Sequence, residues 1–222
     1  MKNVLDYLTW EHVELGVRIT GCDKSFEGAL EVPVLINGVA VIEISAKAFA
    51  KCEKITSVAL PDSVEVVGEE AFSYCSKLEE LHLGAGIKKI EDCAFALCSW
   101  LKSVKIPGTV ESVGKYAFSS CSGLEELHLG AGIKKLEKGA FWWCSSLKSV
   151  EIPDTVESVG KCAFWRCSSL KSVEIPGTVE SVGEGAFSEC SSLRRVVLPS
   201  TLEELARDAF DKSVDLVVDD DI

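Results

Sequence analysis

Cysteine is the residue type with the most chemistry to offer in this chain, because a thiol can form a disulfide, hold a metal ion or act as a nucleophile. Seven of the ten cysteines recur at a spacing of 23 residues: Cys52, Cys75, Cys98, Cys121, Cys144, Cys167 and Cys190. If the repeats stack, these thiols lie about 4.8 Å apart and point the same way. A disulfide needs converging Cβ vectors, and zinc needs CxxC or paired-histidine spacing. We therefore interpret the column as small, buried, apolar filler.

The other metal-binding and redox residue types form no recognisable constellation. Three cysteines lie outside the column, and their redox state stays open: Cys22, Cys93 and Cys162. His82 and His128 are 46 residues apart, which is two repeats and about 10 Å in a stack. That distance is too long for a shared metal ion, and His12 lies in a different part of the chain. We predict no metal site and no cofactor.

Motifs of the common enzyme classes are absent from the sequence. It contains no P-loop, GxSxG, HExxH or glycine-rich dinucleotide motif. The abundant serines follow from a recurring C-S-S-L segment, and nothing assembles a nucleophile, a base and oxyanion donors. We predict that the protein is not an enzyme, and catalysis stays a distant third hypothesis.

The cysteine spacing belongs to a repeat that spans most of the chain. All nine phenylalanines follow it: Phe26, Phe49, Phe72, Phe95, Phe118, Phe141, Phe164, Phe187 and Phe210. A fixed step of this kind is typical of a solenoid, in which each coil stacks on its neighbour. The unit reads A-F-x-x-C-S-x-L-x-x-V-x-I-P-x-x-V-x-x-V-G-x-x. Full copies begin at Ala48, Ala71, Ala94, Ala117, Ala140, Ala163 and Ala186, with a truncated copy at Ala209 and a degenerate one at Ser25.

Each copy predicts two short strands and one tight turn. The segment Leu147–Ile152 alternates as a half-buried strand does, and Pro153 ends it because proline donates no ladder hydrogen bond. A second extended piece follows at Val156–Val159, and Gly160 allows the turn into the Ala-Phe segment. That segment suits at most a single helical turn. The prediction is a mainly β solenoid of 23-residue coils, with parallel sheets along its sides.

The unit L-x-x-V-x-I-P-x-x-V-x-x-V-G-x-x-A-F-x-x-C resembles the BspA-like, or treponemal, class of leucine-rich repeat over about residues 25 to 214. Val32–Phe49 also resembles that family's usual first repeat. The resemblance implies a right-handed, curved leucine-rich-repeat solenoid used for protein or cell-surface interaction, often on secreted bacterial or protist proteins, and it carries over no catalytic residue. The chain departs from the family pattern where Gly84-Ala85-Gly86 and Gly130-Ala131-Gly132 replace the proline.

The ends fall outside the period. We predict an N-terminal cap over residues 1–24, in which Val13, Leu15, Val17 and Ile19 alternate as one amphipathic strand. The array then covers residues 25–213, with one degenerate, seven full and one truncated copy. Residues 214–222 form either an edge strand blunted by Asp219, Asp220 and Asp221 or an acidic tail.

Net charge and hydrophobicity disfavour some classes of binding partner. The formal net charge of −12 disfavours nucleic acid and anionic membranes, and no apolar run is long enough to span a bilayer. Met1–Trp10 does not resemble a secretory signal peptide. The chain as given is therefore expected to be cytoplasmic, or to have been supplied without its export sequence.

Charges vary regularly between copies. Two rows alternate in sign: Glu79-Glu80, Lys102, Glu125-Glu126 and Lys148 in one, and Lys88-Lys89, Glu111, Lys134-Lys135 and Glu157 in the other. Opposite charges one coil apart should attract weakly. Towards the C-terminus the rows become a basic stripe (Lys148, Lys171, Arg194-Arg195) and an acidic one (Glu157, Glu180, Glu203-Glu204). The stripes are either solvated faces of a duplicated unit or a steering surface for a charged partner.

Aromatic residues give the sharpest functional signal. The two positions after the repeated Phe are small or polar in several copies but include Trp142-Trp143 and Trp165-Arg166. Candidate partner-binding residues are Trp142, Trp143, Trp165, Arg166, Trp100, Leu97 and Tyr74. These side chains either form a binding hot spot or fold over the coil edge as extra core or as a dimer contact. The leading hypothesis is a protein-binding scaffold with an unknown protein partner, and the alternative is a self-associating structural or surface-adhesion unit.

Overall fold

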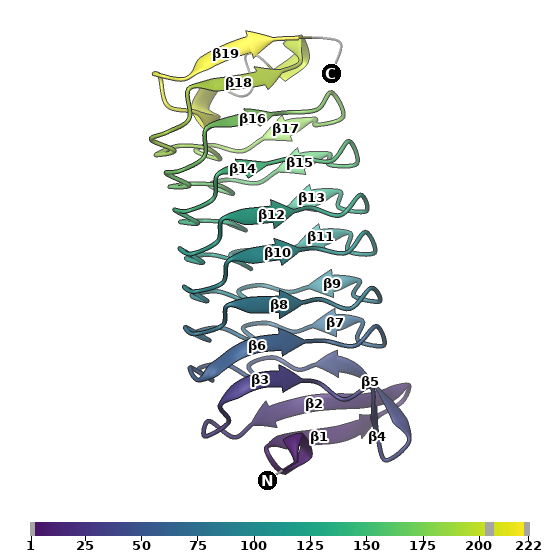
Figure 1. Cartoon of the computed structure of the whole chain (residues 1–222). Coiled ribbons are helices and arrows are strands. Elements are labelled where there is room, and N and C mark those ends of the chain that lie inside the picture. Colours follow the sequence, from purple (N-terminus) through teal and green to yellow (C-terminus); the bar gives the residue numbers. More distant parts are fainter. Residues whose placement is uncertain (1–2, 203–206, 220–222) are drawn as a thin grey trace.

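Each full repeat forms one coil of an elongated β-solenoid, and the coils stack along a single axis (Figure 1). The computed structural model describes residues 3–202 and 207–219. Parallel strands from successive coils pair with a step of 23 residues, as in Val104 with Leu127 and Val113 with Leu136. This arrangement confirms the mainly β solenoid with parallel sheets along its sides.

Three sheets follow from this stacking. One contains β3 (Gly28–Glu31), β6 (Ile55–Ala59), β8 (Glu80–His82), β10 (Ser103–Lys105), β12 (Glu126–His128) and β14 (Ser149–Val150). The second contains β1 (Leu8–Val13), β2 (Gly16–Cys22), β4 (Leu35–Ile36), β5 (Val39–Ile44), β7 (Val66–Val67), β9 (Lys89–Ile90), β11 (Ser112–Val113), β13 (Lys135–Leu136), β15 (Ser158–Val159) and β17 (Ser181–Val182). The third contains β16 (Ser172–Glu174), β18 (Arg195–Leu198) and β19 (Asp215–Val218). Three short 3-10 helices complete the described elements: η1 (Val4–Asp6), η2 (Ser200–Leu202) and η3 (Arg207–Ala209).

The Ala-Phe segments form a third, hydrogen-bonded side of turns. In the first full copy, the Cys52 N–H donates to the Phe49 carbonyl at 3.0 Å, while the N–H groups of Phe49 and Lys51 donate to the next coil. Two positions per coil take left-handed backbone angles, two residues before and two after the Phe. A left-handed non-glycine residue costs about 1 kcal/mol, so the bonds between coils must offset this cost in every repeat.

Phenylalanine and cysteine columns fill the core. The rings from Phe49 to Phe210 stack in series, with neighbouring centroids 4.7 to 5.5 Å apart and planes within 12° of parallel. The seven column cysteines are buried free thiols. Six of them do more than fill space, because each thiol donates to the Phe carbonyl of the preceding coil, as Cys121 does to Phe95 at 3.3 Å.

Phe26 lies outside this ladder although the spacing had included it. Its ring packs edge-on against Tyr7 at 5.2 Å. In the strands that follow, Leu30 pairs with Val58, a step of 28 rather than 23 residues. The β4–β5 hairpin lengthens this first coil, so the Phe26–Phe49 interval matches the period without structural equivalence.

The N-terminal end begins with a hairpin rather than one long strand. β1 and β2 pair antiparallel, and β2 then pairs with β5 of the array. A turn at residues 14–15 interrupts the alternation expected from Val13 to Ile19, so Leu15 is exposed while Val17 and Ile19 are buried. At the other end β19 pairs with β18. Residues 203–206 and 220–222, which include Glu203, Glu204, Asp220 and Asp221, lie outside the described residues.

In four copies a glycine stands three residues before the Ala of the Ala-Phe segment and allows close packing between coils: Gly68, Gly114, Gly160 and Gly183. Gly114 does not adopt a left-handed angle, and a Cβ built there would lie 2.6 Å from the Glu91 carbonyl carbon of the preceding coil. The predicted role of this glycine in the turn is therefore replaced by a steric one: only a residue without Cβ lets the two backbones approach this closely.

Candidate functional site on the turn side

A groove runs along the turn side across four coils. We call it the turn groove; it has a volume of about 670 Å³ and is lined by Glu70, Ser73, Tyr74, Cys93, Ala96, Leu97, Tyr116, Ser119, Ser120 and Trp142. These residues come from three columns of the repeat, at two residues before the Phe, one after it and two after it. The groove is therefore a product of stacking, and no single coil contains it.

The depth of the groove comes from small side chains in its middle column. Ser73, Ala96 and Ser119 all follow the Phe directly, and all three are buried. The next residue in this column is Trp142, which is half-buried and closes the groove at that end. A change from hydroxymethyl to indole over one coil thus creates a floor and an end wall.

The end wall belongs to an aromatic cluster, which we define as Trp142, Trp143, Trp165 and Arg166. The Trp142 and Trp165 rings stack at 5.2 Å with planes 7° apart, and Trp143 meets both edge-on. The Arg166 guanidinium lies 4.3 Å from the Trp165 ring centroid and 5.1 Å from that of Trp143. Its Nε is also 3.8 Å from a Glu189 carboxylate oxygen. Cation–π contact and the ion pair together hold Arg166 in place.

The structure brings six of the seven candidate residues to this side. The four cluster residues contact one another, while Tyr74 and Leu97 form one wall of the groove that Trp142 closes. Trp100 does not line the groove, and its ring contacts no other aromatic ring in the described part of the chain. Trp143, Tyr74 and Trp100 remain 41%, 48% and 53% exposed. Within the cluster, only Trp143 is therefore exposed, while Trp142, Trp165 and Arg166 are half-buried.

Sequence reasoning missed the opposite wall. Glu70, Cys93 and Tyr116 stand two residues before the Phe of successive copies. The Tyr116 ring lies over Gly139, where a built Cβ would be 2.3 Å from its Cε1. The Lys138 ammonium lies 5.7 Å from the same ring. The column two residues before the Phe is visible in the aligned repeats, but its orientation follows only from the left-handed backbone.

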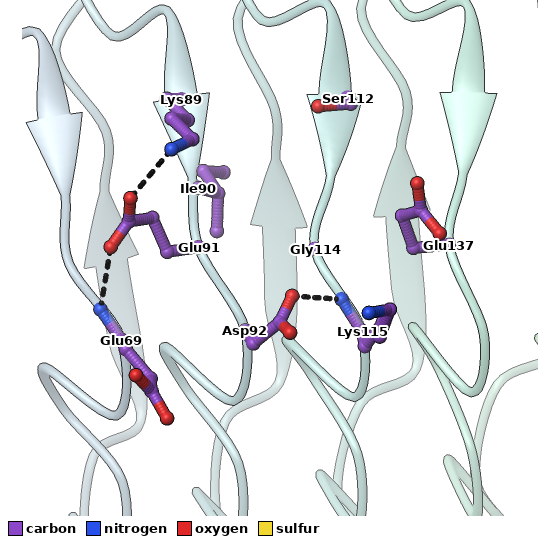
Figure 2. Close-up of a pocket in the computed structure, with 9 residues that line it drawn as sticks. All are labelled: Glu69, Lys89, Ile90, Glu91, Asp92, Ser112, Gly114, Lys115 and Glu137. Carbon is purple, nitrogen blue, oxygen red and sulfur yellow. Dashed lines mark hydrogen bonds and ion pairs between the residues drawn. The ribbon is translucent and has the colours of Figure 1, made fainter.

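A second, polar hollow lies where β9, β11 and the following turns meet (Figure 2). Glu91 bridges two groups: it accepts from Lys89 Nζ at 2.6 Å and from the Glu69 backbone N–H at 3.1 Å. Asp92 accepts from the Lys115 backbone N–H at 2.8 Å. The Glu91 hydrogen bond, followed by its charge, raises the pKa of Lys89. These two carboxylates already accept hydrogen bonds from backbone N–H groups of neighbouring coils. They therefore form part of a structural network.

In the described part of the chain, the histidines and acidic groups are too dispersed to form a metal site. His82 ends β8 and His128 ends β12, with β10 between the two strands. Among residues 3–202 and 207–219, no group of three His, Cys, Asp or Glu side chains is placed to hold a metal ion.

Ion pairs between coils follow one predicted row and depart from the other. Lys102 pairs with Glu79 at 2.8 Å, and Lys148 pairs with Glu125. In the second row, Lys88 pairs with Glu65 of the preceding coil at 2.9 Å rather than with Glu111. These side chains are exposed, so solvent screens each pair and its contribution to stability is small. The pairs favour the order of stacking.

Comparisons with known proteins agree with this architecture. The model of the BspA type leucine-rich repeat region matches residues 42–171 and 88–217. A leucine-rich repeat protein of T. pallidum has a TM-score of 0.81 and 28% identity, covering 96% of this chain and 100% of the other. A leucine-rich cell surface protein of Faecalibacterium prausnitzii (TM-score 0.64, 20% identity, 88% and 69% coverage) and a leucine-rich repeat protein of Bacteroides ovatus (0.54, 22%, 99% and 79%) share the fold. No curated protein matches the chain by sequence. None of the helices in the described ranges is long and apolar enough to cross a membrane.

Proposed function

The chain belongs to the BspA-type leucine-rich repeat family, and we propose that it is a non-catalytic binding module that receives a segment of a protein partner in the turn groove. The family is one of repeat scaffolds, for which interaction and cell-surface roles are the common use. Within this chain, the turn groove and the aromatic cluster combine exposed aromatic surface with a recess, which is the combination that binding hot spots favour.

One observation carries the proposal: the aromatic stack is interrupted next to Trp142. Trp165 stacks on Trp142 at 5.2 Å, but the next position of the same column is Ser119, which offers no ring. The space above Ser119 is part of the groove that Trp142 lines. A planar side chain from a partner can continue the stack there at the spacing of one coil.

The charge of the groove lining indicates which second residue a partner segment should carry. Glu70 is the charged residue of the groove lining. It lies at the far end from Trp142, three coils away in the repeat. A partner segment with an aromatic residue near Trp142 and a basic residue near Glu70 therefore fits the groove in both shape and charge. Glu70 already pairs with Lys47 at 3.6 Å, so the basic residue would compete with this exposed ion pair.

Selection from a phage-displayed peptide library on the full chain tests the proposal. The selected peptides are expected to share an aromatic residue followed or preceded by a basic one, and to bind Trp142→Ser at least tenfold more weakly. Trp100→Ser is the matched control, because it removes an exposed tryptophan outside the groove. Peptides that bind Trp142→Ser as tightly as the unaltered chain would reject this surface as the binding site.

A further inference from the structure

The floor of the turn groove carries two largely buried hydroxyl groups that make no hydrogen bond within the described part of the chain. They belong to Ser73 and Ser119, which are 3% and 8% exposed and both line the groove. Neither hydroxyl is enclosed, because among the described residues the one enclosed side-chain polar atom that lacks a hydrogen bond is Arg18 Nε. Both hydroxyls therefore reach the groove.

Serines elsewhere in the repeat use their hydroxyls between coils. The serine that follows the column cysteine donates to the equivalent serine carbonyl of the preceding coil, as Ser168 does to Ser145 at 3.2 Å. The same bond recurs at four other coils. A largely buried hydroxyl without such a bond is costly, and it calls for a partner from outside the chain. Ser73 and Ser119 thus mark two points on the groove floor where a ligand would be held.

The spacing of these two points indicates the conformation of that ligand. Ser73 and Ser119 are two coils apart in one column, with Ala96 between them. The phenylalanine rings of the same three coils are spaced by 5.2 and 5.1 Å, so equivalent groups two coils apart are separated by about 10 Å. A polyproline II helix repeats every three residues, or about 9.3 Å, whereas same-face residues of a β-strand repeat at about 6.7 Å. The floor therefore matches polyproline II and not a strand.

The chemistry of the groove also suits a polyproline II segment. Such a segment has no internal hydrogen bonds, so its carbonyl groups stay available to outside donors. Two carbonyls three residues apart face the same way and can accept from the two serine hydroxyls. Tyr74 and Tyr116 stand on opposite walls, and Trp142 closes one end. Grooves lined by aromatic side chains are the usual receptors for this conformation.

We propose that the partner segment lies along the turn groove as a polyproline II helix, with an aromatic residue and a basic residue three positions apart. This inference rests on the proposed binding function and specifies the partner's conformation. The aromatic ring stacks on Trp142 at the level of Ser119. The basic side chain reaches Glu70 at the level of Ser73, since these two residues belong to one coil.

A fluorescein-labelled peptide from the phage selection tests the conformation on the full, unaltered chain by fluorescence anisotropy. Replacing both residues between the aromatic and the basic residue with proline should retain or raise the affinity, because proline pre-organises this helix. Removing or adding one residue between them should weaken binding at least fivefold. Groove-dependent peptides with a spacing of two or seven residues, or a tenfold loss on adding the prolines, would overturn the inference in favour of a strand or an α-helix.

Variants of the floor separate this inference from the proposed function. Ser73→Ala and Ser119→Ala should each weaken the peptide three- to tenfold without lowering the melting temperature, because each removes a hydroxyl that has no partner in the chain. Ser188→Ala is the matched control, since it occupies the same column outside the groove lining and should leave the affinity unchanged. Undiminished affinity in both floor variants would refute the inference alone. A peptide that is insensitive to Trp142→Ser would reject the groove itself, and the inference with it.

Discussion

Trp142 stacks on Trp165 at 5.2 Å with nearly parallel rings, while the neighbouring position of the same column is Ser119. Because the stack of indoles ends at this point, the surface of the turn side differs from one coil to the next, although the core beneath it is regular. The phenylalanine ladder continues through every full coil, whereas the indole stack stops beside a groove. A regular scaffold thereby acquires one position that differs from all the others.

The first prediction concerns the indole that ends the groove. Trp142→Ser should weaken binding of a groove-selected peptide by at least tenfold, which corresponds to about 1.4 kcal/mol or more and is typical of a hot-spot residue. Titration calorimetry gives the affinity, and circular dichroism checks the fold. Trp100→Ser should change the affinity less than twofold. Equal losses in both variants would contradict a role for the groove itself.

The second prediction concerns the phenylalanine ladder. Phe118 is fully buried between Phe95 and Phe141, so Phe118→Ala should lower the free energy of unfolding by about 3–5 kcal/mol. Urea denaturation measures this loss. Trp143→Ala, which shortens a partly exposed aromatic side chain, should cost much less. A loss below about 1 kcal/mol for Phe118→Ala would show that the ladder is not the core.

The third prediction separates two glycines of the same coil. In Gly114→Ala the new methyl would lie 2.6 Å from the Glu91 carbonyl carbon, whereas at Gly108 the nearest atom is 3.9 Å from the built Cβ. Gly114→Ala should therefore destabilise the protein by about 2 kcal/mol or more, through backbone displacement between coils. Gly108→Ala should be within about 0.5 kcal/mol of the unaltered chain. Thermal unfolding of the two variants side by side distinguishes these outcomes.

The fourth prediction concerns the thiol hydrogen bonds. Cys121 donates to the Phe95 carbonyl from a fully buried position. Cys121→Ala should cost about 1–2 kcal/mol, because it removes both this bond and the buried sulfur. Cys162→Ala, at a half-buried position outside the column, should cost less than about 0.5 kcal/mol. Urea midpoints of the two variants provide the comparison. Equal losses of stability would show that the column cysteines only fill space.

The fifth prediction concerns self-association. If the protein acts through the turn groove, it should be a monomer by light scattering, with a molar mass that does not change between low and high salt. The ion pairs between coils are already satisfied within one chain, as Lys102 with Glu79 illustrates. Salt-dependent oligomers would instead favour the structural or adhesion alternative.

The stacked architecture could be predicted from the sequence because identical residues recur at fixed intervals. Phe49 and Cys75 occupy their expected columns, since each full copy places them in the same surroundings. Phe26 shows the limit of this reasoning: it keeps the interval, but the β4–β5 hairpin lengthens its coil and moves it out of register. Spacing alone does not distinguish a residue in an equivalent structural position from one that falls at the same interval by coincidence.

The candidate site was only partly predictable for a related reason. Alignment of the repeat copies singled out Trp142 and Trp165, because they stand where other copies have small residues. The opposite wall of the turn groove, including Tyr116, depends on left-handed backbone angles at non-glycine residues. Such angles cannot be predicted from the residue types.

The affinity of Ser119→Trp for a groove-selected peptide tests the central claim most directly. The added indole should occupy the position next to Trp142 and extend the stack within the chain, so the fold should be retained. We predict that binding falls by at least tenfold in this variant, as it does in Trp142→Ser. Undiminished affinity in a folded Ser119→Trp protein would contradict the account, because the partner would then not occupy the groove.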